Sequence, residues 1–160
     1  MSFRVRLEKE NFKFSGTHFT ILGPEEAERL HGHNYYVWVE LELSKIHPEF
    51  GFAFDFNLVK PLIVALCRSL DEYILLPARS AYLKIQRTDT TVEVTFHDKV
   101  FHFPSSDVRE LPVANVTCEE LARYLTSELA KTLPNNLGVT CLTVAVNETR
   151  GQGVAFSLKL

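Results

Sequence analysis

The sequence HGHNYYVWVELEL, from His31 to Leu43, alternates between two kinds of side chain along its whole length. Every second residue from Tyr35 to Leu43 is apolar or aromatic. The residues on the opposite face end in two glutamates, Glu40 and Glu42. A period of two predicts a β-strand with one buried face. Since His31 and His33 share the phase of the apolar residues, this strand begins with two imidazoles that point to the same side.

A second alternating segment precedes this strand, and one of its faces carries Phe12, Phe14, Gly16 and His18. Strands that follow each other in a sequence usually lie side by side, so the two segments are predicted to pair antiparallel. That pairing would bring His18 close to His31 and His33.

Two helices are predicted later in the chain. The first follows Asn57, a credible N-cap, and its apolar residues recur every four positions at Leu58, Leu62, Leu66, Leu70 and Ile74, with Val59 and Ile63 alongside. The second begins at Thr117, which has the spacing of a capping box with Glu120. Its buried stripe is predicted to be Leu121, Leu125 and Leu129.

Alternation returns between the helices and after the second one. Residues 82–103 predict one or two small hairpins, with turns near 88–91 and 97–99, and strands are predicted at 139–149 and 154–160. The order of elements is typical of the α+β class, in a single domain of 160 residues. Four strands and two helices would bury one sheet face and leave the sheet edges open, which favours closure by other subunits.

Composition excludes several classes of function. The net charge is −3, so no basic excess indicates a nucleic-acid partner. The N-terminus lacks the apolar core of a signal peptide, and the apolar run Leu62–Cys67 is far too short to span a bilayer. The three cysteines (Cys67, Cys118 and Cys141) are widely spaced and are predicted to be reduced thiols. We therefore expect a cytoplasmic protein with no membrane partner.

The histidine pair indicates a metal site. Two neutral imidazoles suit zinc, and a catalytic zinc site needs three protein ligands and one open position. His18 is the candidate for the third ligand. A lone HxH pair is common and is also compatible with ordinary surface or core histidines. The third histidine and the acidic loop at 25–28 favour metal.

Several longer motifs resemble the 6-pyruvoyl-tetrahydropterin synthase family, which includes the 6-carboxy-tetrahydropterin synthases of queuosine synthesis. They are FSGTHF, LHGHNY, GFAFDFNLVK, LDEYIL, VTCEELARYL and VNET, in family order over nearly the whole chain, with residues 82–115 as an unmatched insertion. The resemblance implies the tunnelling fold (T-fold), in which each subunit gives a four-stranded antiparallel sheet and two helices on one face. It also implies homo-oligomers, as trimers that close a barrel or hexamers of two stacked trimers.

The resemblance further implies an interface zinc site that binds a small-molecule substrate, a dihydropterin with a phosphorylated side chain. Its zinc ligands match His18, His31 and His33. The pterin anchor matches Glu148, whose carboxylate can accept two parallel N–H bonds from the pterin edge. Glu148 is otherwise an ordinary solvated residue at a strand end.

Two further positions match the family's substrate-binding pair before the second helix, Thr117 and Cys118, where free backbone N–H groups can bind pterin acceptors. Thr117 is equally compatible with a plain helix cap. Asp71 matches the aspartate of the family's catalytic Asp-His pair, but Glu72 stands where the histidine is expected. This departure puts the family's proton relay in question.

The second departure lies before the HGH motif. The synthases have a catalytic cysteine in this loop, whereas this chain has none there and places Glu28 three residues before His31. The pattern ExxHGH resembles a family branch of folate-pathway enzymes that cleave the side chain of 7,8-dihydroneopterin triphosphate to give 6-hydroxymethyl-7,8-dihydropterin. Glu28 is then the candidate base. It is otherwise one of several solvated acids of the loop.

Three functions remain open from the sequence. The first is a zinc-dependent lyase that uses Glu28 for carbon–carbon cleavage. The second is a 6-pyruvoyl- or 6-carboxy-tetrahydropterin synthase with another acid–base group. The third is a catalytically inactive pterin-binding homologue, for which the Asp71–Glu72 departure is the evidence.

Overall fold

The computed structural model describes residues 2–149 and 151–160 and contains two β-sheets. The main sheet has the strand order β7 (Val108–Leu111), β3 (Tyr73–Pro77), β1 (Phe3–His18), β2 (His31–Leu43), β8 (Val139–Thr149) and β9 (Gln152–Lys159). A smaller sheet, called the inserted sheet below, consists of β4 (Leu83–Arg87), β5 (Thr91–Phe96) and β6 (Lys99–Pro104). The helices are α1 (Lys60–Arg68) and α2 (Cys118–Thr132), and short 3₁₀ turns lie at Phe56–Leu58, Ser105–Asp107 and Asn135–Leu137.

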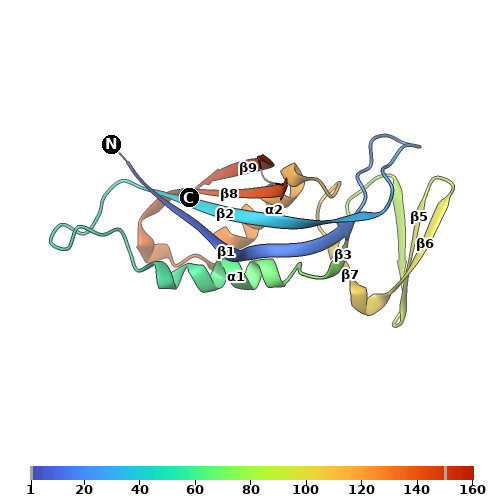
Figure 1. Cartoon of the computed structure of the whole chain (residues 1–160), viewed down its shortest axis with the longest axis horizontal. Helices are drawn as coiled ribbons and strands as arrows, with labels where there is room; N and C mark the ends of the chain where they lie inside the picture. Colours follow the sequence, from blue (N-terminus) through green and yellow to red (C-terminus); the bar gives the residue numbers. More distant parts are fainter. Residues whose placement is uncertain (1, 150) are drawn as a thin grey trace.

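Both helices lie along the same side of the long strands (Figure 1). The predicted alternation of β2 is confirmed, because Tyr35 and the four apolar residues that follow on its face are at most 4% exposed. On α2, the predicted stripe of Leu121, Leu125 and Leu129 is buried against them. The α+β class and the placement of both helices on one sheet face are therefore confirmed.

The long strand β1 has a large bulge. It pairs antiparallel with β2 as predicted, but the register shifts between Glu8 and Lys13. Extra residues in one strand change the phase of its side chains. Leu7, an odd-numbered residue, and Phe12, an even-numbered one, therefore both point into the core.

The predicted strand count is too low, because the main sheet has six strands instead of four. The two additional strands, β3 and β7, are parallel to their neighbours, so the sheet is also not purely antiparallel. Strand β3 is buried on both faces: Leu75 packs into the core under the helices, and Leu76 packs into a second core under the inserted sheet. A strand buried on both sides does not alternate, and its pattern was therefore missed.

The predicted face of the first helix is correct only in part, because the core-facing side lies around Val59 and Ile63 and not around Leu58 and Ile74. Leu58 is 49% exposed and lies in a 3₁₀ turn before α1, and Ile74 belongs to β3. Asn57 is not the N-cap: its backbone N–H donates to Asp55 Oδ1 at 2.9 Å. The fully buried residues are Val59, Ile63, Cys67 and Leu70, of which only Cys67 was not predicted, and Leu62 and Leu66 are partly buried against the same core. Both stripes are apolar, so only packing against β1 distinguishes them.

The ends of α2 and the turns of the inserted sheet follow the sequence pattern. Thr117 Oγ1 accepts a hydrogen bond from the Glu120 backbone N–H at 3.4 Å, as a capping residue does. The strands of the inserted sheet are separated at residues 88–90 and 97–98, within the predicted turns.

All three cysteines are free thiols. Within residues 2–149 and 151–160, the helices are too short or too polar to cross a membrane.

The corrected face of α1 can be tested by unfolding in urea. Ile63 is 1% exposed, so Ile63→Ala should lower the free energy of unfolding by about 2–5 kcal/mol through lost burial and a residual cavity. The matched change Leu58→Ala, at an exposed position, should cost about 0.5 kcal/mol or less. Equal costs for the two variants would contradict the assigned face.

Candidate functional site

The register of β1 and β2 places three histidines together. His18 pairs with His31, and Gly16 pairs with His33, so the imidazoles lie at the same end of the two strands. The centroid of the His18 ring lies 4.7 Å from that of the His31 ring and 5.3 Å from that of the His33 ring. One nitrogen of each residue lies within 4.8 Å of the other two, an arrangement that could hold a metal ion.

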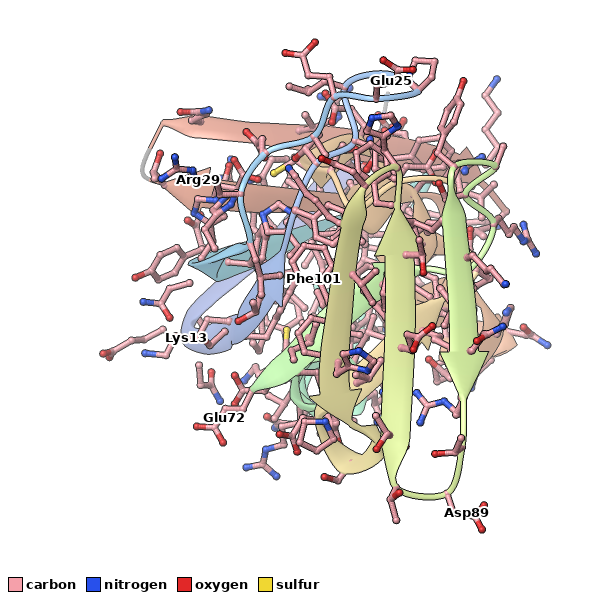
Figure 2. The ribbon with its side chains drawn as sticks, turned by 90° about the vertical axis from the view of Figure 1, so that its right-hand side faces the viewer. Lys13, Glu25, Arg29, Glu72, Asp89 and Phe101 are labelled. Carbon is pink, nitrogen blue, oxygen red and sulfur yellow. The ribbon has the colours of Figure 1, made fainter. Side chains whose placement is uncertain are left out.

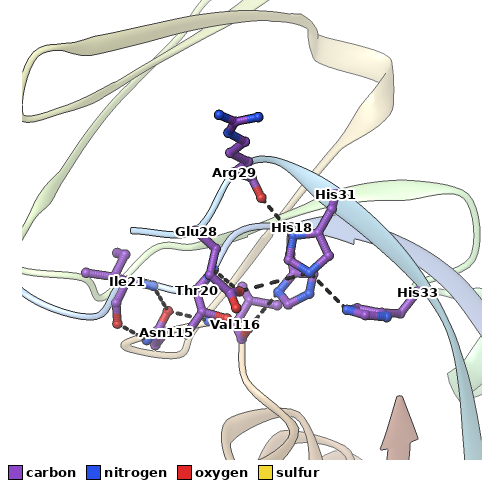
Figure 3. Close-up of polar contacts among 9 residues, drawn as sticks. All are labelled: His18, Thr20, Ile21, Glu28, Arg29, His31, His33, Asn115 and Val116. Atoms are coloured by element: carbon purple, nitrogen blue, oxygen red, sulfur yellow. Dashed lines mark hydrogen bonds and ion pairs between the residues drawn. The ribbon is translucent and has the colours of Figure 1, made fainter. Parts of the chain in front are cut away.

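Backbone carbonyls determine which nitrogen of each ring is free (Figure 3). His18 Nδ1 donates to Val116 O at 2.8 Å, and His31 Nδ1 donates to Arg29 O at 2.7 Å. Because a carbonyl only accepts, both Nδ1 atoms carry the proton, and both Nε2 atoms present a lone pair. The Nε2 atoms of His31 and His33 face each other at 2.9 Å. Such backbone contacts are typical of histidines that orient a ligand nitrogen toward a metal.

The buried His18 Nε2 supports this interpretation. His18 is 1% exposed, and its Nε2 has no hydrogen-bond partner within residues 2–149 and 151–160. A buried polar atom without a partner is costly, and here the lone pair points toward the other two imidazoles. Burial, the largest cause, and the two neighbouring histidines lower the pKa of His18, so its ring is neutral at pH 7. Three imidazoles with an open fourth position fit a zinc ion.

Glu28 differs from the other acids of its loop because its carboxylate is held. Glu28 Oε2 accepts a hydrogen bond from the Thr20 backbone N–H at 3.2 Å and lies 4.0 Å from His31 Nε2. Hydrogen bonding by Thr20, with the nearby histidines as smaller causes, lowers the pKa of Glu28 below its usual value. Glu28 is therefore an ionised base beside the imidazoles at neutral pH. By contrast, Glu25 lies at the outer end of the loop (Figure 2) and is exposed.

A small pocket brings together the three predicted substrate-binding residues. Its volume is about 260 Å³, and its lining includes Thr117, Cys118 and Glu148. Thr20, which also holds Glu28, lines the same pocket, so the pocket adjoins the histidines. Gly153 completes the wall, and a Cβ there would clash with the Val146 backbone carbonyl and the Asn147 side chain, so no larger residue fits.

The thiol in this pocket is not a nucleophile. Burial, followed by the negative charge of Glu148, raises the pKa of Cys118 to about 12. The thiolate is the reactive form, so Cys118 is inert at neutral pH. Cys118 therefore does not replace the cysteine that is missing from the loop before His31.

In the single chain Asp71 belongs neither to the histidine group nor to the lining of the pocket. Its Oδ1 accepts a hydrogen bond from the Ser15 backbone N–H at 2.7 Å, and the Glu72 backbone N–H donates to Ser15 O at 2.7 Å. The pair therefore fixes the backbone of β1 at the point where β3 begins. The Glu72 side chain points outward from the molecule (Figure 2).

The sequence interpretation missed two supporting residues. The Asn115 side chain bonds both backbone groups of Ile21, at 3.1 and 2.8 Å, and accepts from the Val116 N–H at 3.0 Å. It thereby joins the Glu28 loop to the carbonyl that orients His18. The second is Tyr35, which is fully buried beside His18 and His33. Burial raises its pKa well above the usual value, so its hydroxyl stays protonated. No pattern in the sequence marks either role.

Comparisons with known proteins agree with the motifs. The family model for 6-pyruvoyl tetrahydropterin synthase matches residues 6–158. A putative 6-carboxy-5,6,7,8-tetrahydropterin synthase of Methanocaldococcus jannaschii is 32% identical over 147 residues, which are 90% of this chain and 88% of the relative.

Solved structures extend this likeness to the whole chain. The crystal structure of 6-pyruvoyl tetrahydropterin synthase from Plasmodium vivax has a TM-score of 0.93 and 26% identity, and covers 100% of this chain and 99% of its own. A variant of the same Plasmodium protein, in which a catalytic glutamate is replaced by alanine, matches at a TM-score of 0.93 and 25% identity over 100% and 99% of the two chains. The tunnelling fold implied by the motifs is confirmed.

The assignment of Cys118 as an inert thiol can be tested by alkylation. With a pKa of about 12 and a buried sulfur, Cys118 should not react measurably with iodoacetamide at pH 8 in the folded protein. Peptide mapping by mass spectrometry should show modification of Cys118 only after unfolding in urea, which serves as the control. Rapid alkylation of the folded protein at Cys118 would show a reactive thiol.

Proposed function

This chain belongs to the 6-pyruvoyl tetrahydropterin synthase family, and on that premise we propose that it is a zinc-dependent lyase acting on 7,8-dihydroneopterin triphosphate. The proposed reaction is carbon–carbon cleavage of the side chain to 6-hydroxymethyl-7,8-dihydropterin. One observation carries the proposal: an ionised carboxylate, Glu28, lies 4.0 Å from His31 Nε2 at the position where the synthases have a thiol. The Plasmodium vivax relative, whose catalytic residue is a glutamate, supports a carboxylate in this role.

The metal would be held by His18, His31 and His33 through the nitrogens that face one another. Bound zinc would act as a Lewis acid that lowers the pKa of a side-chain hydroxyl of the substrate. A carboxylate base is then strong enough to take the hydroxyl proton. The backbone carbonyls that bind His18 and His31 keep both rings in the tautomer that this role needs.

The pterin ring would bind in the pocket beside the histidines. The Glu148 carboxylate would accept two N–H bonds from the 2-amino-pyrimidinone edge, in the way that a carboxylate binds a guanidinium. Thr117 and Cys118 stand at the start of α2, where backbone N–H groups can donate to the ring's acceptors. Cys118 would thus contribute its backbone, since its thiol is protonated.

Glu28 would act as the general base. Its carboxylate takes the proton from the hydroxyl on the second side-chain carbon, and the oxygen's electron pair forms a carbonyl as the adjacent C–C bond breaks. The bond's electrons pass to the first carbon and the dihydropterin ring. The proton is then returned to the first carbon, giving the hydroxymethyl product, while the aldehyde fragment keeps the triphosphate. The cleavage therefore requires neither an oxidant nor a reductant.

A second candidate function is favoured by the curated relatives. The Methanocaldococcus jannaschii protein is named a putative 6-carboxy-5,6,7,8-tetrahydropterin synthase at 32% identity. That activity would require removal of a proton from carbon, which is harder for a carboxylate than removal of a hydroxyl proton. Identification of the product separates the two functions, and pterin binding without turnover would indicate the inactive homologue.

We infer that Asp71 contributes to catalysis only in a closed oligomer, a trimer or a hexamer of stacked trimers. In the single chain Asp71 is exposed, its carboxylate accepts a hydrogen bond from the Ser15 backbone, and it is not part of the histidine group. A neighbouring copy pairing with the open edge at β9 would bring a second surface to the site. The three free cysteines fit a cytoplasmic enzyme.

The metal assignment predicts about one zinc per chain in the purified protein. His31→Ala removes one of the three ligands, so zinc content should fall to near zero in elemental analysis after dialysis. His102→Ala, on the exposed inserted sheet, is the matched control and should keep its zinc. Unchanged zinc in His31→Ala would mean that these histidines do not hold it.

The role of Glu28 predicts a selective loss of turnover. Glu28→Gln keeps the side chain's shape but removes its basicity, so turnover should fall by roughly 10²-fold or more while zinc content and pterin binding are retained. Glu25→Gln, at the loop's outer end, should leave the rate unchanged. The product is to be identified by mass spectrometry. Wild-type rates in Glu28→Gln, or 6-pyruvoyl-tetrahydropterin as the product, would refute the assignment.

A further inference from the structure

The inserted sheet packs directly against the loop that carries Glu28. We propose that this sheet is a positioning element for the Glu28 carboxylate, and that Phe101 acts as a positioning residue through Phe19. The proposal rests on the proposed function, because it takes Glu28 as the base. It assigns a role to a part of the chain that contributes no residue to the histidine group or to the pterin pocket.

The inserted sheet is rigidly mounted on the main sheet. Its inner face shares a core with Leu76 of β3 and Val108 of β7, which are 0% and 6% exposed. The Arg87 guanidinium fastens one side of it: Nε donates to Glu110 Oε1 at 2.7 Å, and the two terminal nitrogens donate to Ser105 O and Val108 O. The sheet therefore cannot shift without breaking both a buried core and a charged hydrogen-bond network.

Phe101 connects this mounted sheet to the loop. The Phe101 ring stacks on the Phe19 ring, with the centroids 5.5 Å apart and the planes at 23°. The centroid of the Phe96 ring lies 6.3 Å from that of Phe19. Phe19 is thereby 3% exposed, and the partly buried Ala27 and Leu30 of the same loop pack against the same core. Figure 2 shows Phe101 on the side of the inserted sheet that faces this loop.

A single residue, Thr20, links Phe19 to the Glu28 carboxylate. Phe19 precedes Thr20, whose N–H donates to Glu28 Oε2 at 3.2 Å and whose carbonyl accepts from the Glu28 N–H at 2.9 Å. A displacement of Phe19 therefore moves both groups that hold Glu28. The Glu28 side chain itself is 43% exposed, so packing around it does not fix its position.

The test compares two phenylalanines on the same face of β6. Phe101→Ala removes the contact with Phe19, whereas Phe103→Ala is the matched control, since Phe103 stacks on Phe101 but is not paired with Phe19 among the described aromatic contacts. In the zinc-loaded protein, Phe101→Ala should lower kcat for 6-hydroxymethyl-7,8-dihydropterin formation by about 10-fold, with KM and zinc content unchanged. Phe103→Ala should keep kcat, and Phe101→Tyr should restore it. If Phe101→Ala fails to fold, Phe101→Leu replaces it.

A second readout does not depend on activity. Amide hydrogen exchange at Thr20 and Glu28 should quicken in Phe101→Ala and stay slow in Phe103→Ala, because the two backbone groups are held only while Phe19 is fixed. Unchanged kcat and unchanged exchange in Phe101→Ala would overturn the proposal. Equal losses in both variants would also overturn it, since they would indicate a merely structural role.

A double mutant separates this proposal from the proposed function. In a Glu28→Gln background, Phe101→Ala should cause no further loss of kcat, because the group it positions is already absent. A further 10-fold loss there would show that Phe101 acts on something other than Glu28. If Glu28→Gln alone keeps wild-type turnover, the proposed function is wrong, and the exchange measurement still decides whether Phe101 fixes the loop.

Discussion

The antiparallel pairing of β1 with β2, in the register that places His18 opposite His31, is the constraint on which the rest of the structure depends. One residue of slip would turn His31 and His33 to the other sheet face and would bury Glu40 and Glu42 under the helices. The apolar face of β2 prevents this, because it must remain against α1 and α2. The same packing that stabilises the fold therefore also brings the three imidazoles together.

Strand β3 joins two cores that serve different purposes. Leu75 belongs to the core under the helices, and a Cβ on Gly16 would lie 3.0 Å from Leu75 Cδ1, so glycine permits the close approach of β1 and β3. Leu76 belongs to the core under the inserted sheet. The first core positions the histidines through β1 and β2. The second core holds the loop between these strands, which carries the acid–base candidate. Support for the site thus comes from both faces of the main sheet.

The electrostatics of the site divide the ionisable groups by role. Burial keeps His18 neutral and Cys118 protonated, so the first can donate a lone pair and the second cannot act as a nucleophile. Glu28 is exposed enough to be solvated and is hydrogen-bonded by Thr20, and it remains ionised. A carboxylate base beside a group of three imidazoles suits the removal of a hydroxyl proton. This arrangement is the physical basis for favouring cleavage over chemistry that begins at a C–H bond.

The sequence by itself determined the elements that have one buried face. Period-two alternation located β1 and β2, the capping box located α2, and the HxH spacing selected the histidines, because each pattern records a local contrast between core and solvent. Such a contrast is absent from β3, which is buried on both sides, and ambiguous in α1, where two adjacent stripes are apolar. Only the tertiary structure decided those cases. It also decided the contacts of Asn115 with Ile21 and of Phe101 with Phe19. These contacts join residues more than eighty positions apart through side-chain packing and side-chain-to-backbone hydrogen bonds, which leave no local pattern.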